Sequence, residues 1–191
     1  ALLFLSLFLA SRASFAQETF DIKNSSRLYD LSVRITKCAE EQQKDNTGSC
    51  SGPGSISIYR KGSTFPFQIL KLANIEVDKE QMAFNPAINR DPRKLYDDEY
   101  SFIFGDFNFD GREDLAVCNG REGGYSAPSY NVYLYSIRSK RFFENRRLSK
   151  LTEGYLGLFF VDSKKKQLIA LAKSGCCYHG TEIYKVINNR P

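Results

Sequence analysis

Four oxygen-bearing side chains crowd residues 106–114, and their spacing is the most chemically specific feature of the sequence. They are Asp106, Asn108, Asp110 and Asp114. Carboxylates held this close would repel one another by roughly a few kcal/mol per pair at an effective dielectric of about 20. A bound divalent cation turns that repulsion into attraction. The spacing therefore predicts a loop that wraps a hard cation.

Calcium is the cation that we expect in this loop. Gly111 permits the sharp turn, and Arg112 would offer its backbone carbonyl oxygen. Magnesium keeps more of its water, and zinc prefers nitrogen and sulfur ligands. The loop differs from an EF-hand, because Val117 stands where a bidentate Glu would be and the strand-like "LAVCNG" replaces a helix. It resembles the calcium loops of FG-GAP-type propeller blades, in which case the ion would stiffen a hairpin. An acidic surface turn without metal is the alternative.

A segment rich in glycine and hydroxyl groups follows the acidic loop. It reads "NGREGGYSAPSYNVYLY", and its candidate partner-binding residues are Tyr125, Ser126, Ser129 and Tyr130. Tyr and Ser on a rigid loop suit protein recognition, since Tyr covers a large area at low entropic cost. The alternative is an ordinary long hairpin with Tyr130 packed inward.

The first sixteen residues have the pattern of an export signal. They form an apolar run that ends in the small-x-small pattern Ser14-Phe15-Ala16, so we expect the mature protein to begin at Gln17. The run is shorter than the roughly 20 apolar residues of a membrane span. No positively charged region precedes it, which predicts that the first residues of the leader are missing. The mature protein is expected to be exported and soluble, without a membrane span.

Five cysteines in an exported chain indicate disulfides rather than a redox site. Cys38 and Cys50 flank a polar loop and are expected to form a bond that closes it. Cys118, Cys176 and Cys177 are three candidates for one further bond, and the sequence leaves the choice among them open. The remaining thiol is expected to be buried.

Short apolar-polar alternations separated by turn residues predict an all-β protein. Clear examples begin at Leu31, Ser55 and Tyr130. The segment around Asp106 can be laid over the segment around Asp162, an offset of about fifty residues that is typical of propeller blades. We expect about ten short strands in a single domain over residues 17–191, with antiparallel hairpins in a small propeller-like or sandwich-like arrangement.

The charge of the chain does not indicate a nucleic-acid partner. Losing Arg12 with the signal lowers the net charge from +5 to +4, and the cations are scattered without a nucleic-acid motif. Solvated turns explain them best, and anionic cell-wall polymers are a second interpretation.

The order of these features resembles a known family over roughly residues 50–190. The acidic loop, "LAVCNG", "SAPSYNVYLY" and "SGCCYHG" together look like the periplasmic invertebrate-type lysozyme inhibitors. They are closer still to immunity proteins against lysozyme-like effectors of type IV secretion systems. The resemblance implies that a Ser-Gly-x-x-Tyr motif, matched here to Ser126 and Tyr130 with Ala127 in place of Gly, enters the cleft of a lysozyme-like glycoside hydrolase. Its hydroxyls would hydrogen-bond the paired catalytic carboxylates of that periplasmic partner.

Two other classes of function compete with inhibition. The FG-GAP-like loop and the tyrosines would also suit a calcium-dependent carbohydrate-binding or adhesion module. An exported hydrolase would have to use His179, the only histidine, with Cys177 as a neighbouring nucleophile. No third orienting group or nucleophile-elbow sequence supports that pair, so we do not expect an enzyme.

Overall fold

The computed structural model describes most of the chain outside the signal segment. The described residues are 17–23, 26–38, 49–79, 83–84 and 100–191. The predicted signal segment 1–16 and the polar loop between Cys38 and Cys50, residues 39–48, lie outside them.

The first sheet is a four-stranded antiparallel meander in the order β1-β2-β3-β4. Its strands are β1 (Glu18–Ile22), β2 (Tyr29–Ile35), β3 (Ser49–Arg60) and β4 (Pro66–Asp78). Strand β2 alternates buried and more exposed residues along its length. This period of two places one apolar row in the core and leaves the other toward solvent, as the sequence predicts.

The second sheet has five strands in the order β5-β6-β7-β8-β9. They are β5 (Ala83–Phe84), β6 (Phe102–Gly105), β7 (Asp114–Gly120), β8 (Ser129–Ser136) and β9 (Arg141–Glu144). Strands β5 and β6 are parallel and the other pairs are antiparallel. A short 3-10 turn, η1 (Gly124–Ser126), lies between β7 and β8.

Strand β7 is the centre of the molecule because both of its faces are covered. Leu115 and Val117 belong to a core shared with the first sheet. Ala116 and Cys118 belong to a second core, which includes residues of the helix and of the third sheet. This double burial explains why β7 has a continuous apolar sequence instead of an alternating one.

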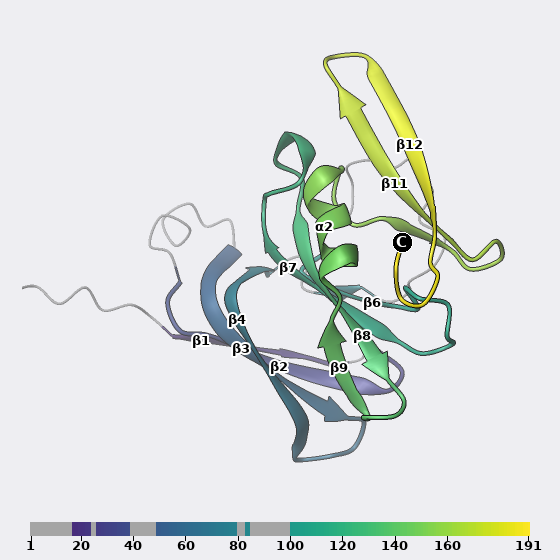
Figure 1. The fold of residues 1–191 in the computed structure, drawn as a ribbon. Coiled ribbons are helices and arrows are strands. Elements are labelled where there is room, and N and C mark those ends of the chain that lie inside the picture. The colour runs from purple at the N-terminus through teal and green to yellow at the C-terminus, as the bar shows by residue number, and fades with distance from the viewer. Residues whose placement is uncertain (1–16, 24–25, 39–48, 80–82, 85–99) are drawn as a thin grey trace, which may run out of the picture.

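The third sheet has three strands in the order β10-β11-β12, all antiparallel. They are β10 (Phe160–Asp162), β11 (Gln167–Ser174) and β12 (Tyr178–Lys185). The β11–β12 hairpin projects from the body at the top of Figure 1. Asp162 pairs with Gln167 across the turn between β10 and β11.

A helix, α2 (Arg146–Gly154), covers part of β8 and departs from the all-β prediction. Its N-cap, Asn145, accepts hydrogen bonds from the backbone N–H groups of Arg147 and Leu148 at 3.2 and 3.1 Å. The hydroxyls of Ser149 and Thr152 accept from backbone N–H groups of β8 at 2.9 and 2.8 Å. The helix therefore satisfies the part of β8 that β9 does not reach.

The protein is thus mostly β, with three small sheets and one short α-helix, and the described strands do not close into a propeller. The expected propeller-like arrangement is therefore wrong. The first core is built from both the four-stranded and the five-stranded sheets, which pack face to face. No helix in the described part of the chain has the length and apolar character that a membrane crossing requires.

Candidate functional site

The acidic loop joins β6 to β7 and is closed by hydrogen bonds to its own backbone. The two carboxylate oxygens of Asp106 accept from the backbone N–H groups of Asp110 and Gly111 at 3.0 and 2.8 Å. Asp110 accepts from the backbone N–H of Arg112 at 2.9 Å. Gly111 has a φ of 83°, a left-handed conformation that glycine adopts without strain. The first part of the loop is therefore folded around its own acidic side chains.

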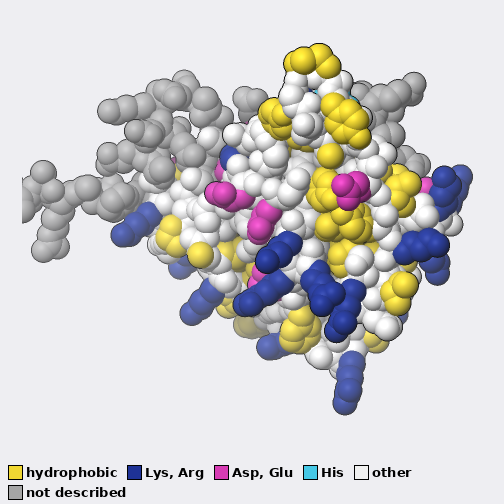
Figure 2. All heavy atoms as spheres, turned by 45° about the horizontal axis from the view of Figure 1, so that its top comes forward, with side chains coloured by type: hydrophobic (Ala, Val, Ile, Leu, Met, Phe, Trp, Pro, Cys, Tyr) yellow, Lys and Arg dark blue, Asp and Glu magenta, His cyan; other side chains and the backbone are white. Residues whose placement is uncertain are grey.

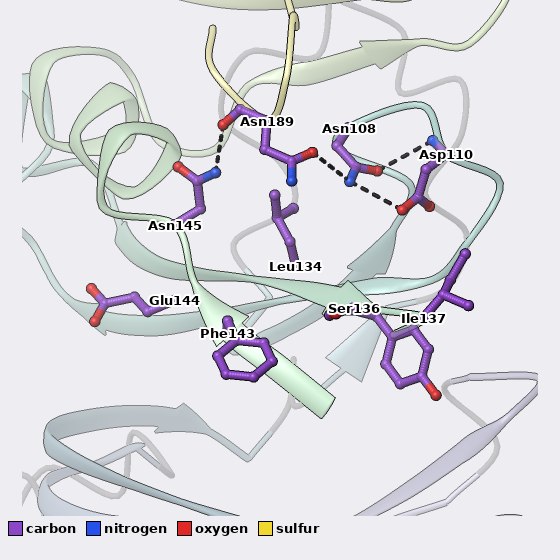
Figure 3. A pocket seen from close by; sticks show the side chains of 10 residues that line it. Asn108, Asp110, Leu134, Ser136, Ile137, Phe143, Glu144, Asn145 and Asn189 are labelled. Atoms are coloured by element: carbon purple, nitrogen blue, oxygen red, sulfur yellow. Dashed lines mark hydrogen bonds between the residues drawn. The ribbon is translucent and has the colours of Figure 1, made fainter. Parts of the chain in front are cut away.

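Asn108 connects this loop to the C-terminal end of the chain. Its side-chain Nδ2 donates to Asn189 Oδ1 at 2.9 Å and to Asp110 Oδ2 at 3.2 Å. Its Oδ1 accepts from the backbone N–H of Asp110 at 3.2 Å. The backbone carbonyl of Asn189 in turn accepts from Asn145 Nδ2 at 2.7 Å. The C-terminal turn thus joins the loop to the N-cap of helix α2 (Figure 3).

Asp114 occupies a different environment from the other acidic side chains. It is fully buried, and its two oxygens accept from the backbone N–H groups of Phe107 and Tyr135 at 2.9 and 2.8 Å. Burial raises the pKa of Asp114 to about 8, with smaller contributions from Asp110 and Asp106, and the two backbone hydrogen bonds oppose the shift. In this arrangement Asp114 pins the loop to strand β8.

The donor set of the loop fits a hard cation in its chemistry, because every donor is an oxygen. Asp106, Asn108, Asp110 and the carbonyl of Arg112 are the residues that would hold the ion. Asp114 was also predicted as a ligand, but both of its oxygens accept from backbone N–H groups. Among the described residues, however, the acidic side chains of the loop do not converge within 4.8 Å of one another. The potential metal-ligand atoms of Glu18, Cys38 and Cys50 do lie within that distance of one another, but the two cysteines form a disulfide. Calcium therefore remains a prediction, and closing around an ion would require the loop side chains to move together.

The hydroxyl-rich segment divides into a buried half and an exposed half. Ser129 is fully buried and Tyr130 is 2% exposed. Tyr130 donates to the carbonyl of Tyr100 at 3.0 Å, and Ser129 donates to Asn119 Oδ1 at 2.7 Å. Both side chains stabilise the interior in this structure, so the predicted placement of Tyr130 in a partner's cleft does not fit its location. The cause is helix α2, which covers this part of β8.

Tyr125 and Ser126 form the exposed half. The Tyr125 side chain is 59% exposed, and both residues adopt left-handed backbone conformations, with φ values of 56° and 60°. The loop is held from behind by Gly124 N–H, which donates to the carbonyl of Tyr155 at 2.8 Å. A Cβ at Gly123 would lie 2.6 Å from the carbonyl oxygen of Ala127, so only glycine permits this close approach.

Tyr125 also contacts the tip of the β11–β12 hairpin. Its hydroxyl accepts from the backbone N–H of Gly175 at 2.6 Å, and the ammonium group of Lys173 lies 5.0 Å from the centre of its ring. The tip, residues 174–178, is exposed, and Tyr178 is 66% exposed. Two loops far apart in the sequence thus form one continuous surface, the tip surface, at the projecting end of the molecule (Figure 1).

The tip surface contains hairpin residues that were not among the predicted partner-binding residues. The Ser-Gly-x-x-Tyr pattern occurs without any departure at Ser174, Gly175 and Tyr178. Scanning the whole chain for that pattern would have found it, whereas Ser126 and Tyr130 match only with Ala127 in the glycine position. Figure 2 shows apolar and aromatic side chains gathered at this end.

The base of the hairpin is stabilised by a cluster of hydroxyl and carboxylate groups. Tyr155 donates to Glu182 Oε2 at 2.6 Å, and Tyr184 donates to the same oxygen at 2.8 Å. These two hydrogen bonds hold the pKa of Glu182 below its usual value. The Tyr155 ring also stands edge-on against Tyr184. The cluster joins β12 to the segment that follows helix α2.

The cysteines form two disulfides among the described residues. Cys38 is bonded to Cys50, and Cys176 is bonded to its neighbour Cys177 at the hairpin tip. Cys118 is buried, and its thiol contacts the carbonyl of Gly120 at 3.7 Å. Because Cys177 is bonded to Cys176, its sulfur is not a free thiol beside His179.

A cavity of about 380 Å³ lies between the acidic loop and the β8–β9 hairpin. The carboxamides of Asn108, Asn145 and Asn189 line one side, and Ile137 and Phe143 line another (Figure 3). The carboxamides bind one another and the surrounding backbone. Their hydrogen bonding is therefore used within the protein, and the cavity does not by itself indicate a ligand site.

One comparison with known proteins gives a relative. No protein-family model matches the chain, and no curated protein matches it. The chain is similar in sequence and structure to a solved structure described as that of a Xanthomonas Type IV Secretion System related protein. The two are 29% identical, with a TM-score of 0.73, over 91% of this chain and 77% of that one. The protein is therefore a β-rich relative of a type IV secretion system related protein.

Proposed function

We propose that this protein is a periplasmic inhibitor, acting as an immunity protein, that binds and blocks a lysozyme-like peptidoglycan hydrolase. The observation that carries the proposal is the contact between Tyr125 and Gly175, which unites two exposed loops into the tip surface. The similarity to a type IV secretion system related protein supports it. So does the intact Ser-Gly-x-x-Tyr pattern at the hairpin tip.

The proposed mechanism is occlusion of the hydrolase cleft. Glycoside hydrolases place two carboxyl groups on either side of the scissile bond. A narrow hairpin tip fits such a cleft, and the hydroxyls of Ser174 and Tyr178 would hydrogen-bond the carboxyl groups while the backbone excludes the sugar. Ser126 and Tyr125 extend the contact beside it. Lys173 adds a positive charge, which favours an anionic cleft.

Calcium is proposed as a structural cofactor of the acidic loop. It would neutralise the repulsion between Asp106 and Asp110. The loop is joined to the C-terminal turn through Asn108 and Asn189, and that turn directly follows strand β12. A stiffened loop would therefore also stiffen the base of the hairpin that carries the tip.

A turbidity assay tests the proposal. Purified residues 17–191 should slow the clearing of cell walls by an invertebrate-type lysozyme or a lysozyme-like effector. Tyr178→Ala should abolish this effect without changing the melting temperature, because its side chain is exposed. Ile183→Ala is the matched control, since Ile183 lies on the same strand and is 60% exposed. Full inhibition by Tyr178→Ala, or none by the unaltered protein, would contradict the proposal.

A carbohydrate-binding or adhesion module would behave differently. It would bind glycans with no enzyme present, and Tyr178→Ala would change glycan binding instead of hydrolysis. Measuring binding to purified peptidoglycan without enzyme separates the two functions.

A further inference from the structure

A second exposed surface lies in the segment that runs from the β8–β9 turn into helix α2. Residues 137–150 contain six cations and a single acid, Glu144. All six cations are exposed, and they are Arg138, Lys140, Arg141, Arg146, Arg147 and Lys150. None of them forms an ion pair with a described residue, although three such pairs occur elsewhere. We call these six side chains the basic patch.

The position of two of these cations is unfavourable for the helix itself. Arg146 and Arg147 begin α2, and its first turn contains no acidic residue. The N-terminal end of a helix carries a partial positive charge, so acidic side chains stabilise it and basic ones oppose it. The helix therefore does not benefit from these arginines, and an anionic partner would explain them.

Two large apolar side chains are exposed within the same segment. Ile137 is 55% exposed and Phe143 is 52% exposed. Phe142 and Leu148 of the same segment are buried, Phe142 in the first core and Leu148 in the second. Exposed apolar groups among cations are typical of surfaces that lie on an anionic membrane, where the apolar groups enter the headgroup region and the cations meet lipid phosphates.

A lipid surface fits this composition better than a soluble polyanion. A soluble polyanion would neutralise the cations but would leave Ile137 and Phe143 in water. A bilayer covers both kinds of group at once. The acids near the patch are Glu144 inside the segment, Glu153 further along helix α2, and Asp110, which lines the same cavity as Ile137 and Phe143.

The patch begins at the β8–β9 turn, far from the tip surface, and continues into the start of helix α2. The β8–β9 turn is at the bottom of Figure 1, whereas the β11–β12 tip is at the top. Figure 2 shows Lys and Arg side chains gathered over the lower half of the face, away from the projecting end. We propose that the basic patch, with Ile137 and Phe143, docks the protein on an anionic phospholipid membrane and leaves the tip surface free. Only the orientation of the tip toward a partner rests on the proposed function.

Vesicle sedimentation with residues 17–191 tests this inference. The protein should sediment with vesicles that contain phosphatidylglycerol and stay in solution with vesicles of phosphatidylcholine alone. The double variant Arg146→Glu/Arg147→Glu should lower the partition coefficient by at least about tenfold, given the attraction of each surface cation to anionic lipid. The two changes place acids at the helix N-terminus, which favours folding, so unfolding would not explain the loss.

Two further variants complete the design. Phe143→Ser should also weaken binding, because it removes the inserted apolar group. Lys164→Glu/Lys165→Glu is the matched control, since it reverses two charges in the exposed β10–β11 turn, outside the patch. Equal binding to both kinds of vesicle, or an equal loss in the lysine variant, would overturn the proposal. So would binding to polyphosphate that exceeds vesicle binding and is unaffected by Phe143→Ser. Hydrolase inhibition by the same variants should be unchanged, which separates this test from that of the proposed function.

Discussion

The hydroxyl of Tyr125 lies 2.6 Å from the backbone nitrogen of Gly175, a residue fifty positions further along the chain. This hydrogen bond connects the loop between β7 and β8 to the tip of the β11–β12 hairpin. Each loop is exposed and contributes few core residues. We therefore expect their mutual contact to determine how rigidly the tip surface is presented.

Tyr125→Phe should loosen the tip surface while leaving the fold intact. The change removes the hydroxyl that accepts from Gly175 N–H at 2.6 Å and donates to the Gly175 carbonyl at 3.5 Å. Because the site is exposed, the free energy of unfolding should fall by no more than about 1 kcal/mol. Hydrogen exchange of residues 123–128 and 174–177 should become faster. Tyr178→Phe is the control, because Tyr178 is exposed on the same surface and its hydroxyl forms no hydrogen bond with a described residue. Unchanged exchange in Tyr125→Phe would show that the contact does not order the two loops.

Asp114 should make the stability of the metal-free protein depend on pH. Its pKa is raised from 3.8 to about 8 in the folded state, mainly by burial. The folded protein therefore keeps a proton that the unfolded chain releases, so the associated stability is fully present below about pH 4 and is lost as pH rises through about 8. Melting temperatures in chelator should fall across this range.

Asp114→Asn provides the check on that assignment. It should lower the melting temperature at acidic pH, because an amide nitrogen replaces one of two acceptors for buried N–H groups, at a cost of about 1–3 kcal/mol. It should also flatten the pH dependence between pH 4 and 8. An equally steep fall in Asp114→Asn would assign the titration to another group.

Asn189 should support calcium binding from outside the acidic loop. Its side chain fixes the amide of Asn108, whose oxygen faces the loop backbone. Partners that orient metal ligands typically contribute ten- to a hundredfold to affinity, so Asn189→Ala should weaken calcium binding by roughly that factor in calorimetry. Asn188→Ala is the matched control, because Asn188 and Asn189 both have positive φ values, of 50° and 60° respectively. The hydrogen bond from Asn108 goes to Asn189. Equal calcium affinity in the two variants would remove Asn189 from this role.

The strands could be predicted from the sequence wherever one face of the sheet meets water. Strand β2 is an example, because its alternating residues point alternately to core and solvent. The helix was missed, since "RFFENRRLSKLTEG" follows a strand without a break. The sequence feature that indicates this helix is short: the N-cap residue Asn145 is followed by Leu148 and Thr152, which lie on one face.

Which tyrosines are exposed could not be predicted from spacing alone. Strand β8 is covered on both faces near its start, so its alternation does not show which tyrosine reaches solvent. Tyr130 is buried because helix α2, whose Thr152 lies 22 residues further along the chain, packs over it. The exposure of Tyr178 depends on how far the β11–β12 hairpin extends beyond its sheet, which is a property of the tertiary structure.

The proposal that the tip surface enters a hydrolase cleft is tested most directly by hydrogen exchange of the complex. Residues 17–191 would be labelled alone and with a lysozyme-like hydrolase that they inhibit. The proposal predicts strong protection of residues 123–127 and 174–178 and little change over residues 138–150. Protection confined to residues 138–150, or no protection at the hairpin tip, would contradict it.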